Sequence, residues 1–473
     1  MNIKTHIQSL SVILLLSVLS IAFASLRGYN SDSLYSYSQA KDLLQFGSLS
    51  GWTFPAISFL VPDVILSLPF AAILDNPYNF LLASSPIQII LFIYLFSLYY
   101  TSNNTNTDFP TTFTIAAISA AAIAILGSVV FRDVFYFMVE PFFILVHHGF
   151  AASFAVLIFL YAKHDVFLVF KKHYFLSALG LFLLIVSDFY FAFYFGFLII
   201  STFSKTQWRK TLVILVAFSA FSIAIFLASY LMNPSLGFYA NNSLNATNDS
   251  RASVFMGIVF ILVLPTIFVV RLWQMKSLTE EFKQLYIAFL LIAFAIFFMG
   301  LIADKYAFRY LTIAYPISIV LCTKILLSIP ERYKKLLLCF CFLFVLSLTI
   351  YANFLKEKPG RFAFHDEIKC IQEMGLSQST IVADYWPAKM IFESTNRQYN
   401  LIQVDGNLNE RNWVNNSRWK TLYADNGITF VITDQLSKDV ISRLNEKKEA
   451  QSLCGGKVLL IRVEAASIIP LKK

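Results

Sequence analysis

The chain has 473 residues and a formal net charge of +9, with 58% hydrophobic residues and only 14% charged residues. A water-soluble domain carries about 25% charged residues, so the composition excludes an ordinary soluble protein, and equally disorder, collagen, coiled coil or a small disulfide-stapled scaffold. No basic run accompanies the net charge, which therefore gives no support for a nucleic-acid partner.

The charged residues are unevenly distributed along the chain. Residues 357–473 hold 30 of the 65 Asp, Glu, Lys and Arg side chains, and the first 356 residues share the other 35. The sequence thus predicts a polytopic α-helical membrane domain over 1–356 and a soluble domain over 357–473. The apolar stretch 8–26 resembles a signal peptide, but Ala24-Ser25-Leu26 is a poor cleavage site, so we expect an uncleaved first helix.

About 20 apolar residues cross a bilayer as a helix. The clear candidates are the apolar stretches 8–26, 84–101, 112–131, 143–162, 211–232, 253–272, 284–303, 309–328 and 336–355. Two further stretches are ambiguous, because 53–75 is interrupted by prolines and Asp63, and 174–204 carries Asp188 in its middle.

The distribution of Lys and Arg resolves both ambiguities. If 53–75 does not cross and 174–204 is a hairpin that turns at Asp188, thirteen Lys and Arg fall in inside loops and six in outside loops. This predicts about 11 spans, a cytoplasmic N-terminus and a tail on the external or periplasmic side of a bacterial inner (plasma) membrane. Residues 27–83 become a first external loop whose apolar part lies on the membrane surface as short helices.

The tail has its own α/β pattern. Apolar runs at 380–383, 400–404, 428–432 and 458–461 predict strands, with helices at 387–396 and 437–450. Cys370 and Cys454 both lie in this domain, so they can form a disulfide if the domain is outside the cytoplasm.

Three acidic residues fall at the outer mouth of the predicted spans. Asp32 directly follows the first span, and Asp133 and Glu140 lie in the second external loop. Asp32 has two interpretations: a helix N-cap, or a carboxylate that serves as general base for an acceptor hydroxyl or as a metal ligand. Asp133 beside Arg132 is most simply an ion pair.

Histidines and cations supply further candidates. His147 and His148 are adjacent, so on a helix they point about 100° apart and do not easily share one metal; a hydrogen bond to a phosphate or sugar fits better. Asp188 would lie at a hairpin tip, where polar residues are expected. Lys305 and Arg309 stand at the outer end of a span, and Arg suits bidentate phosphate binding, with snorkelling to lipid head groups as the alternative.

Two stretches carry a family resemblance. Arg309-Tyr310-Leu311-Thr312-Ile313-Ala314-Tyr315-Pro316 opens a late span, and Ala383-Asp384-Tyr385-Trp386-Pro387-Ala388-Lys389 lies in the tail. With the acidic first external loop and the small α/β tail, they resemble the GT-C superfamily of integral membrane glycosyltransferases, in its protein-mannosyltransferase-like and aminoarabinose-transferase-like branches.

The resemblance implies a sugar donor linked to polyprenyl phosphate, a glycan, lipid or protein acceptor, and contact with membrane lipids. It implies Asp32 as catalytic base, Glu140 or Asp133 as second acidic group, and Arg309, with Lys305, near the donor phosphate. We assign His147, His148 and Asp188 to substrate binding. The usual Asp-Glu pair is here Asp32-Ser33 and no Asp-x-Asp stands in the second loop, so no cofactor is certain and a divalent metal is not supported.

Two other classes remain open. A transporter or flippase for a lipid-linked glycan would be expected to carry internal repeats and discontinuous charged helices, which the sequence lacks. A non-catalytic envelope protein that presents its tail would need one span rather than eleven. The absence of a P-loop, HExxH, GxSxG, CxxC and a Gly-rich nucleotide fingerprint gives no support for nucleotide-driven chemistry.

Overall fold

The computed structural model describes most of the chain. The described ranges are 3–27, 33–54, 60–104, 107–130, 140–142, 148–162, 174–202, 208–232, 251–298, 311–330, eight residues between 332 and 347, 365–373, 378–411, 415–424, 428–433, 436–446, 448, 450–454 and 458–464.

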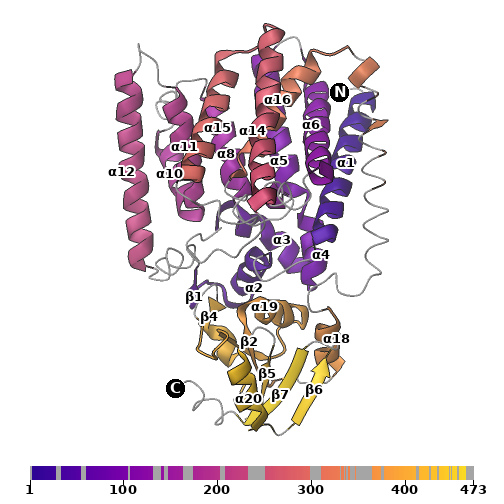
Figure 1. Cartoon of the computed structure of the whole chain (residues 1–473), viewed down its shortest axis with the longest axis vertical. Helices are drawn as coiled ribbons and strands as arrows, with labels where there is room; N and C mark the ends of the chain where they lie inside the picture. The colour runs from indigo at the N-terminus through magenta and orange to yellow at the C-terminus, as the bar shows by residue number, and fades with distance from the viewer. Residues whose placement is uncertain are drawn as a thin grey trace. The chain divides into compact units, whose positions relative to one another are not determined.

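The chain divides into two compact units (Figure 1). The first, here the helical unit, comprises Met1–Ala24, Ile57–Asp63 and Ser84–Asn353. Its helices follow uninterrupted runs of Leu, Ile, Phe and Ala. They are α1 (Ile3–Arg27), α5 (Ile87–Asn103), α6 (Phe109–Val130), α8 (Gly149–Tyr161), α10 (Tyr174–Ser187), α11 (Phe189–Ser201), α12 (Trp208–Met232), α14 (Arg251–Gln274), α15 (Glu280–Phe298) and α16 (Ala314–Leu327), with a 3₁₀ turn η2 at Glu140–Phe142.

The helices of this unit pack around one apolar core. α16 lies against α6 and α14, and α11 lies against α8, α12 and α15. Two polar side chains inside the core bond to helix carbonyls: the Tyr315 hydroxyl donates to the carbonyl of Ala120 at 2.9 Å, and the Thr323 hydroxyl donates to the carbonyl of Ile319 at 2.7 Å. The first of these bonds joins α16 to α6.

Both ambiguous stretches are broken helices. The predicted interruption of 174–204 at Asp188 is confirmed, because α10 ends at Ser187 and α11 begins at Phe189. The stretch 53–75 holds a π-helical turn η1 (Leu60–Val64) and α3 (Ile65–Ile73). The predicted short helices are thus present, and their position against a membrane stays a prediction.

Helix length bears on the predicted spans. Among the described residues, one continuous stretch, Pro77–Asn103 with 27 residues, is long and apolar enough to cross a membrane by length and composition, and shorter apolar helical segments have 10–17 described residues. Over their full bounds α1 and α12 have 25 residues each and α14 has 24. The protein is mostly helical, and the topology of eleven spans stays a prediction.

The second, here the mixed unit, comprises Ser25–Ala56, Val64–Ala83 and Phe354–Lys473. Most of the predicted external loop 27–83 thus belongs to the same unit as the tail. The unit contains α2 (Tyr35–Phe46), α3, α4 (Pro77–Ser84), α18 (His365–Glu373), α19 (Tyr385–Ser394), α20 (Lys438–Glu446), a 3₁₀ helix η4 (Ser417–Thr421), β1 (Trp52–Thr53), β2 (Thr380–Asp384), β3 (Asn400–Val404), β4 (Asn415–Asn416), β5 (Ile428–Ile432), β6 (Ala450–Cys454) and β7 (Val458–Glu464).

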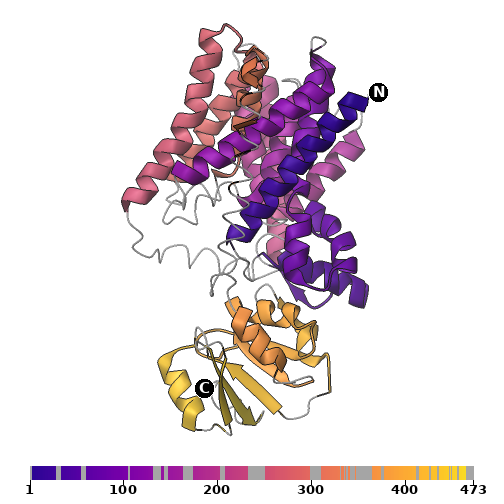
Figure 2. The same cartoon turned by 90° about the vertical axis from the view of Figure 1, so that its right-hand side faces the viewer.

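The tail sheet has the order β3-β2-β5-β7-β6. β2 pairs in parallel with β3 and β5, and β7 pairs antiparallel with β5 and β6. The four predicted strands are confirmed. β6 was not predicted, because Ala450-Gln451-Ser452-Leu453-Cys454 contains no β-branched or aromatic residue and the predicted helix 437–450 ends at its first residue. Figure 2 shows α20 on one face of the sheet and α19 on the other, and the α20 side is sealed by Val440 and Leu444 against Val382 and Val431.

The first external loop is tied into the mixed unit by a short sheet. β1 pairs antiparallel with β4, with Trp52 opposite Asn416. The Tyr37 hydroxyl on α2 bonds to the carbonyl of Leu74 at 3.1 Å and of Asp75 at 2.9 Å, which fixes α2 against the end of α3. A loop that the sequence assigns to the membrane domain is thus built into the fold of the tail.

One cysteine of the tail is oxidised. Cys370 on α18 is part of a disulfide, and α18 packs against β6, the strand that ends at Cys454. The Cys454 side chain lies outside the described residues, so its pairing with Cys370 stays a prediction.

Candidate functional site

The predicted site residues differ in how far the structure describes them. The side chains of His148 and Asp188 are described, Glu140 is described in its backbone only, and outside the described residues lie Asp32, Asp133, His147, Lys305 and Arg309.

His148 and Asp188 form a buried pair in the helical unit. The Nδ1 atom of His148 lies 3.0 Å from Oδ2 and 3.2 Å from Oδ1 of Asp188, and the two residues are 3% and 6% exposed. His148 stands directly before α8 and Asp188 directly before α11, where its carboxylate also accepts from the backbone N–H of Tyr190 at 2.9 Å. Asp188 therefore lies at the junction of α10 and α11, where the sequence predicts a turn, and its side chain is buried there.

Asp188 orients the imidazole of His148 for hydrogen bonding. A carboxylate bonded to Nδ1 fixes the orientation of the imidazole and favours the tautomer whose Nε2 accepts a proton. The Tyr190 ring lies 4.1 Å from the imidazole, centroid to centroid, and holds it in place. Such a pair can take up a proton or hydrogen-bond a hydroxyl or phosphate of a substrate.

Asp63 is a third ionisable group in the same region. It is 3% exposed, and burial, together with the charge of Asp188, raises the pKa of its carboxyl group. The backbone N–H of Val61 donates to the Ser187 hydroxyl at 2.9 Å, which ties η1 to the junction between α10 and α11. The sequence identified Asp63 only as an interruption of an apolar stretch, and nothing local marks it as a partner of Asp188.

The turn that carries Glu140 packs against the start of α8. A Cβ added to Gly149 would lie 2.2 Å from the carbonyl oxygen of Pro141 and 2.0 Å from Nε2 of Gln88, so only glycine allows this approach beside His148. The Phe142 ring of the same turn lies 4.9 Å from the Tyr315 ring. The described part of the predicted second loop thus contacts Tyr315 of α16.

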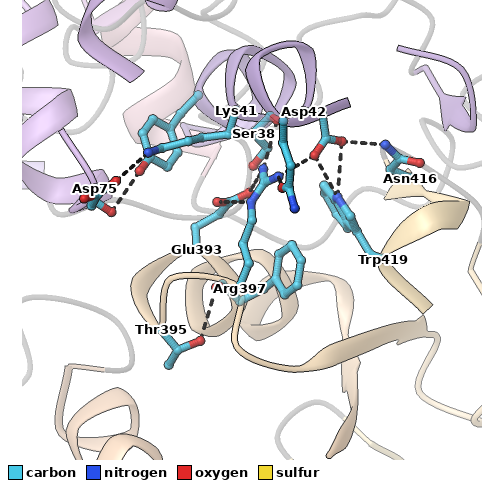
Figure 3. Close-up of polar contacts among 12 residues, drawn as sticks. Ser38, Lys41, Asp42, Asp75, Glu393, Thr395, Arg397, Asn416 and Trp419 are labelled. Carbon is cyan, nitrogen blue, oxygen red and sulfur yellow. Dashed lines mark hydrogen bonds and ion pairs between the residues drawn. The ribbon is translucent and has the colours of Figure 1, made fainter. Parts of the chain in front are cut away.

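A second polar cluster lies inside the mixed unit and is centred on Asp42 of α2 (Figure 3). Asp42 is fully buried. Its carboxylate accepts from the indole N–H of Trp52 at 2.6 Å, from the indole N–H of Trp419 at 3.2 Å and from the side-chain amide of Asn416. Burial raises the pKa of Asp42, and the guanidinium of Arg397 and these donors oppose the rise.

Arg397 joins Asp42 to the tail helix α19. Its Nη1 donates to Asp42, and its Nε and Nη2 donate to the Glu393 carboxylate at 2.9 and 2.7 Å. Nη2 also donates to the carbonyl of Ser38 at 3.0 Å. Burial opposes the charged form, but the Glu393 and Asp42 carboxylates raise the pKa of Arg397 above its usual range. We call Asp42, Glu393, Arg397, Trp52, Trp419 and Asn416 the arginine clamp.

The arginine clamp is a structural cluster. Protein donors engage both carboxylate oxygens of Asp42, and Arg397 donates to two carboxylates and a carbonyl, so these groups are occupied by contacts within the protein. The sequence does not predict this cluster, because its members lie up to 377 residues apart. Among the described residues, no three His, Cys, Asp or Glu side chains are grouped to hold a metal ion.

Comparison of the sequence with models of protein families gives no match, and comparison with curated proteins gives none either.

Proposed function

We propose that the protein is an integral membrane glycosyltransferase that transfers a sugar from a polyprenyl-phosphate-linked donor to a glycan, lipid or protein acceptor at the external face. The acceptor oxygen bonds to the anomeric carbon and its proton passes to Asp32. The bond from that carbon to the phosphate oxygen breaks, and its electron pair leaves with the polyprenyl phosphate. Arg309 and Lys305 stabilise the departing anion, and His148 with Asp188 binds the substrate.

The surface of the helical unit supports the membrane location. Leu10 on α1, Val213 on α12, Trp273 on α14 and Phe294 on α15 are between 61% and 70% exposed. Large apolar side chains exposed on several helices indicate a surface covered by lipid. The described residues of 365–464 expose no large apolar side chain in this way, as expected for a part that lies in water.

The disulfide at Cys370 supports an external tail. Disulfides persist in oxidising compartments and are rare in the cytosol. We therefore expect a reporter fused after Lys473 that is active only outside the cytoplasm to be active. Activity of a cytoplasm-only reporter fused at the same position would overturn the external location of the tail and of every proposed site residue.

The observation that carries the proposal is the buried pair of His148 and Asp188. Ionisable side chains are costly within an apolar helical unit and mark functional sites by default. The pair lies at the start of α8, against which the Glu140–Phe142 turn packs. A candidate substrate-binding pair thus adjoins the turn that carries Glu140, one of the predicted acidic groups. A His–Asp pair is suited to bind the hydroxyl or phosphate groups that every lipid-linked sugar carries.

The test is sugar transfer from polyprenyl-phosphate donors in membranes that carry the wild-type chain, compared with membranes that lack it. His148→Gln should lower kcat/KM about 10- to 100-fold, because a hydrogen bond to a charged group contributes about 1.5–3 kcal/mol. Glu280→Gln on the exposed start of α15 is the control and should transfer normally. Wild-type membranes without transfer would refute the proposed function, and normal kcat/KM in His148→Gln would remove that residue from substrate binding.

A flippase or transporter for a lipid-linked glycan is the second candidate. It is favoured by Asp63, which adds a second buried carboxylate to the His148–Asp188 pair, because chains of Asp, Glu and His form proton relays in transporters. Movement of lipid-linked glycan across vesicles that contain the purified chain, without sugar transfer, would favour this class.

A further inference from the structure

A groove runs along one face of α14 in the helical unit. Its volume is about 430 Å³, within the range of about 300–1,000 Å³ that small-molecule pockets have. Leu262, Val263, Ile267 and Val270 line it, and the last three follow one another at the spacing of one helix face. These three are 44%, 55% and 45% exposed, so this part of the groove is open and apolar.

Thr266 also lines the groove, but its hydroxyl is engaged within the protein. It donates to the carbonyl of Leu262 at 2.6 Å and shares a hydrogen bond of 2.7 Å with the Tyr286 hydroxyl of α15. The second bond ties the groove to the neighbouring helix, against which α14 packs. An occupant of this part of the groove therefore meets a wall fixed between two helices and lined mainly by aliphatic side chains.

The groove becomes polar at the end of α14. Arg271 and Gln274 line it there, and both side chains are exposed. Nη1 of Arg271 donates to Oε1 of Gln274 at 3.4 Å. A guanidinium carries five N–H donors, and this long bond uses one of them. The groove is thus amphiphilic, with an apolar length and a cationic end.

The length of the groove matches one leaflet of a bilayer. Leu262 and Val270 are eight residues apart, which is a rise of about 12 Å along an α-helix. One leaflet contributes about 15 Å of hydrocarbon. Trp273 follows Arg271 by two residues and is 70% exposed, and tryptophan is enriched at the boundary between hydrocarbon and head groups. In a membrane the cationic end of the groove therefore falls at the depth of lipid head groups.

We propose that this groove binds one acidic phospholipid. An acyl chain lies along the aliphatic face of α14, and the phosphate accepts hydrogen bonds from the Arg271 guanidinium, whose planar fork suits phosphate, and from the side-chain amide of Gln274. The inference rests on the membrane location in the proposed function and not on sugar transfer. On the predicted topology α14 ends at the cytoplasmic side and the sugar donor binds at the external side, so the groove is not part of the donor site.

Charge selects the head group. Lys276 follows the end of α14 by two residues and is exposed, so a second cation lies close to Arg271 in the sequence. Basic side chains at the cytoplasmic surface attract anionic lipids, and they repel the choline cation that neutralises phosphatidylcholine. The alternative is that Arg271 only snorkels to the head groups. Snorkelling depends neither on the shape of the groove nor on a single bound lipid.

The experiment is native mass spectrometry of the full chain in detergent, titrated with phosphatidylglycerol or with phosphatidylcholine of the same acyl chains. The wild type should retain one phosphatidylglycerol at concentrations at which phosphatidylcholine is lost. Arg271→Gln should weaken phosphatidylglycerol binding about 10- to 100-fold, because it removes a hydrogen bond between charged groups. Ile267→Trp keeps the charge and fills the groove, so it should weaken binding as well.

The matched control is Lys283→Gln on α15, which removes a cation that is 48% exposed and paired with Glu280. It should bind phosphatidylglycerol as the wild type does. Equal retention of both lipids by the wild type, or unchanged binding in Arg271→Gln, would overturn the inference. Unchanged binding in Ile267→Trp would assign the lipid to snorkelling, and a lipid-free dimer that Ile267→Trp disrupts would assign the groove to a second copy of the chain. None of these outcomes changes the proposed sugar transfer, which its own assay tests.

Discussion

Asp32→Asn should express at the wild-type level and transfer sugar at least about 100-fold more slowly, because an amide does not take up the acceptor proton and general base catalysis contributes about 10²–10⁴-fold. The stability should hardly change. Asparagine caps helices as well as aspartate does, so the alternative interpretation of Asp32 as an N-cap predicts a loss of at most about 1 kcal/mol and full activity. The two interpretations thus predict transfer rates for Asp32→Asn that differ by about two orders of magnitude.

A matched control lies in the same loop. Asp75 pairs with Lys41 at 2.8 Å, and its side chain is 79% exposed. Asp75→Asn makes the same chemical change in the same unit and should leave transfer unaffected. Asp32→Asn with wild-type transfer would remove Asp32 from the mechanism, and a slower reaction explained by less protein would favour the cap.

The tail sheet was predictable because its strands are encoded locally. Runs such as Ile428-Thr429-Phe430-Val431-Ile432 are short, β-branched and apolar, and each one became a strand. The break at Asp188 was predictable for a similar reason, since an aspartate within a long apolar stretch favours a helix start. Both are properties of a few neighbouring residues.

The pairing of distant residues was not predictable. His148 and Asp188 were each chosen as candidates, but the contact between them spans 40 residues and depends on the packing of α8 against α11. The arginine clamp joins Asp42 to Arg397 across 355 residues. Nothing near Asp42 distinguishes it from the other acids of the first loop.

Contacts between distant residues also explain why the two compact units do not follow the composition boundary. A composition boundary near 357 separates apolar from charged sequence. It does not report which segments pack together. The first loop lies far upstream in the sequence, yet it supplies α2 and β1 to the mixed unit. Asp42 of α2 bonds to Arg397 and Asn416 of the tail, and Trp52 of β1 bonds to Asp42.

Arg397→Met should destabilise the mixed unit by about 3–5 kcal/mol, because it leaves the buried carboxylates of Asp42 and Glu393 without their cation. Hydrogen exchange of backbone amides in β2 and β5, measured on the whole chain in detergent, should accelerate at least about 100-fold. Lys369→Met, which breaks the exposed pair with Glu373, should leave exchange unchanged.

The loss of stability in Arg397→Met should depend on pH, with a definite sign. Burial already raises the pKa of Asp42, and Arg397 opposes that rise, so its removal raises the folded-state pKa further. A carboxyl group with a raised folded-state pKa contributes stability below its unfolded pKa, and this is lost as the pH rises through the folded value. The deficit of Arg397→Met should therefore be smallest in acid and grow towards neutral pH. A deficit independent of pH would mean that the loss comes from packing against Phe392 and Trp419 rather than from unpaired charge.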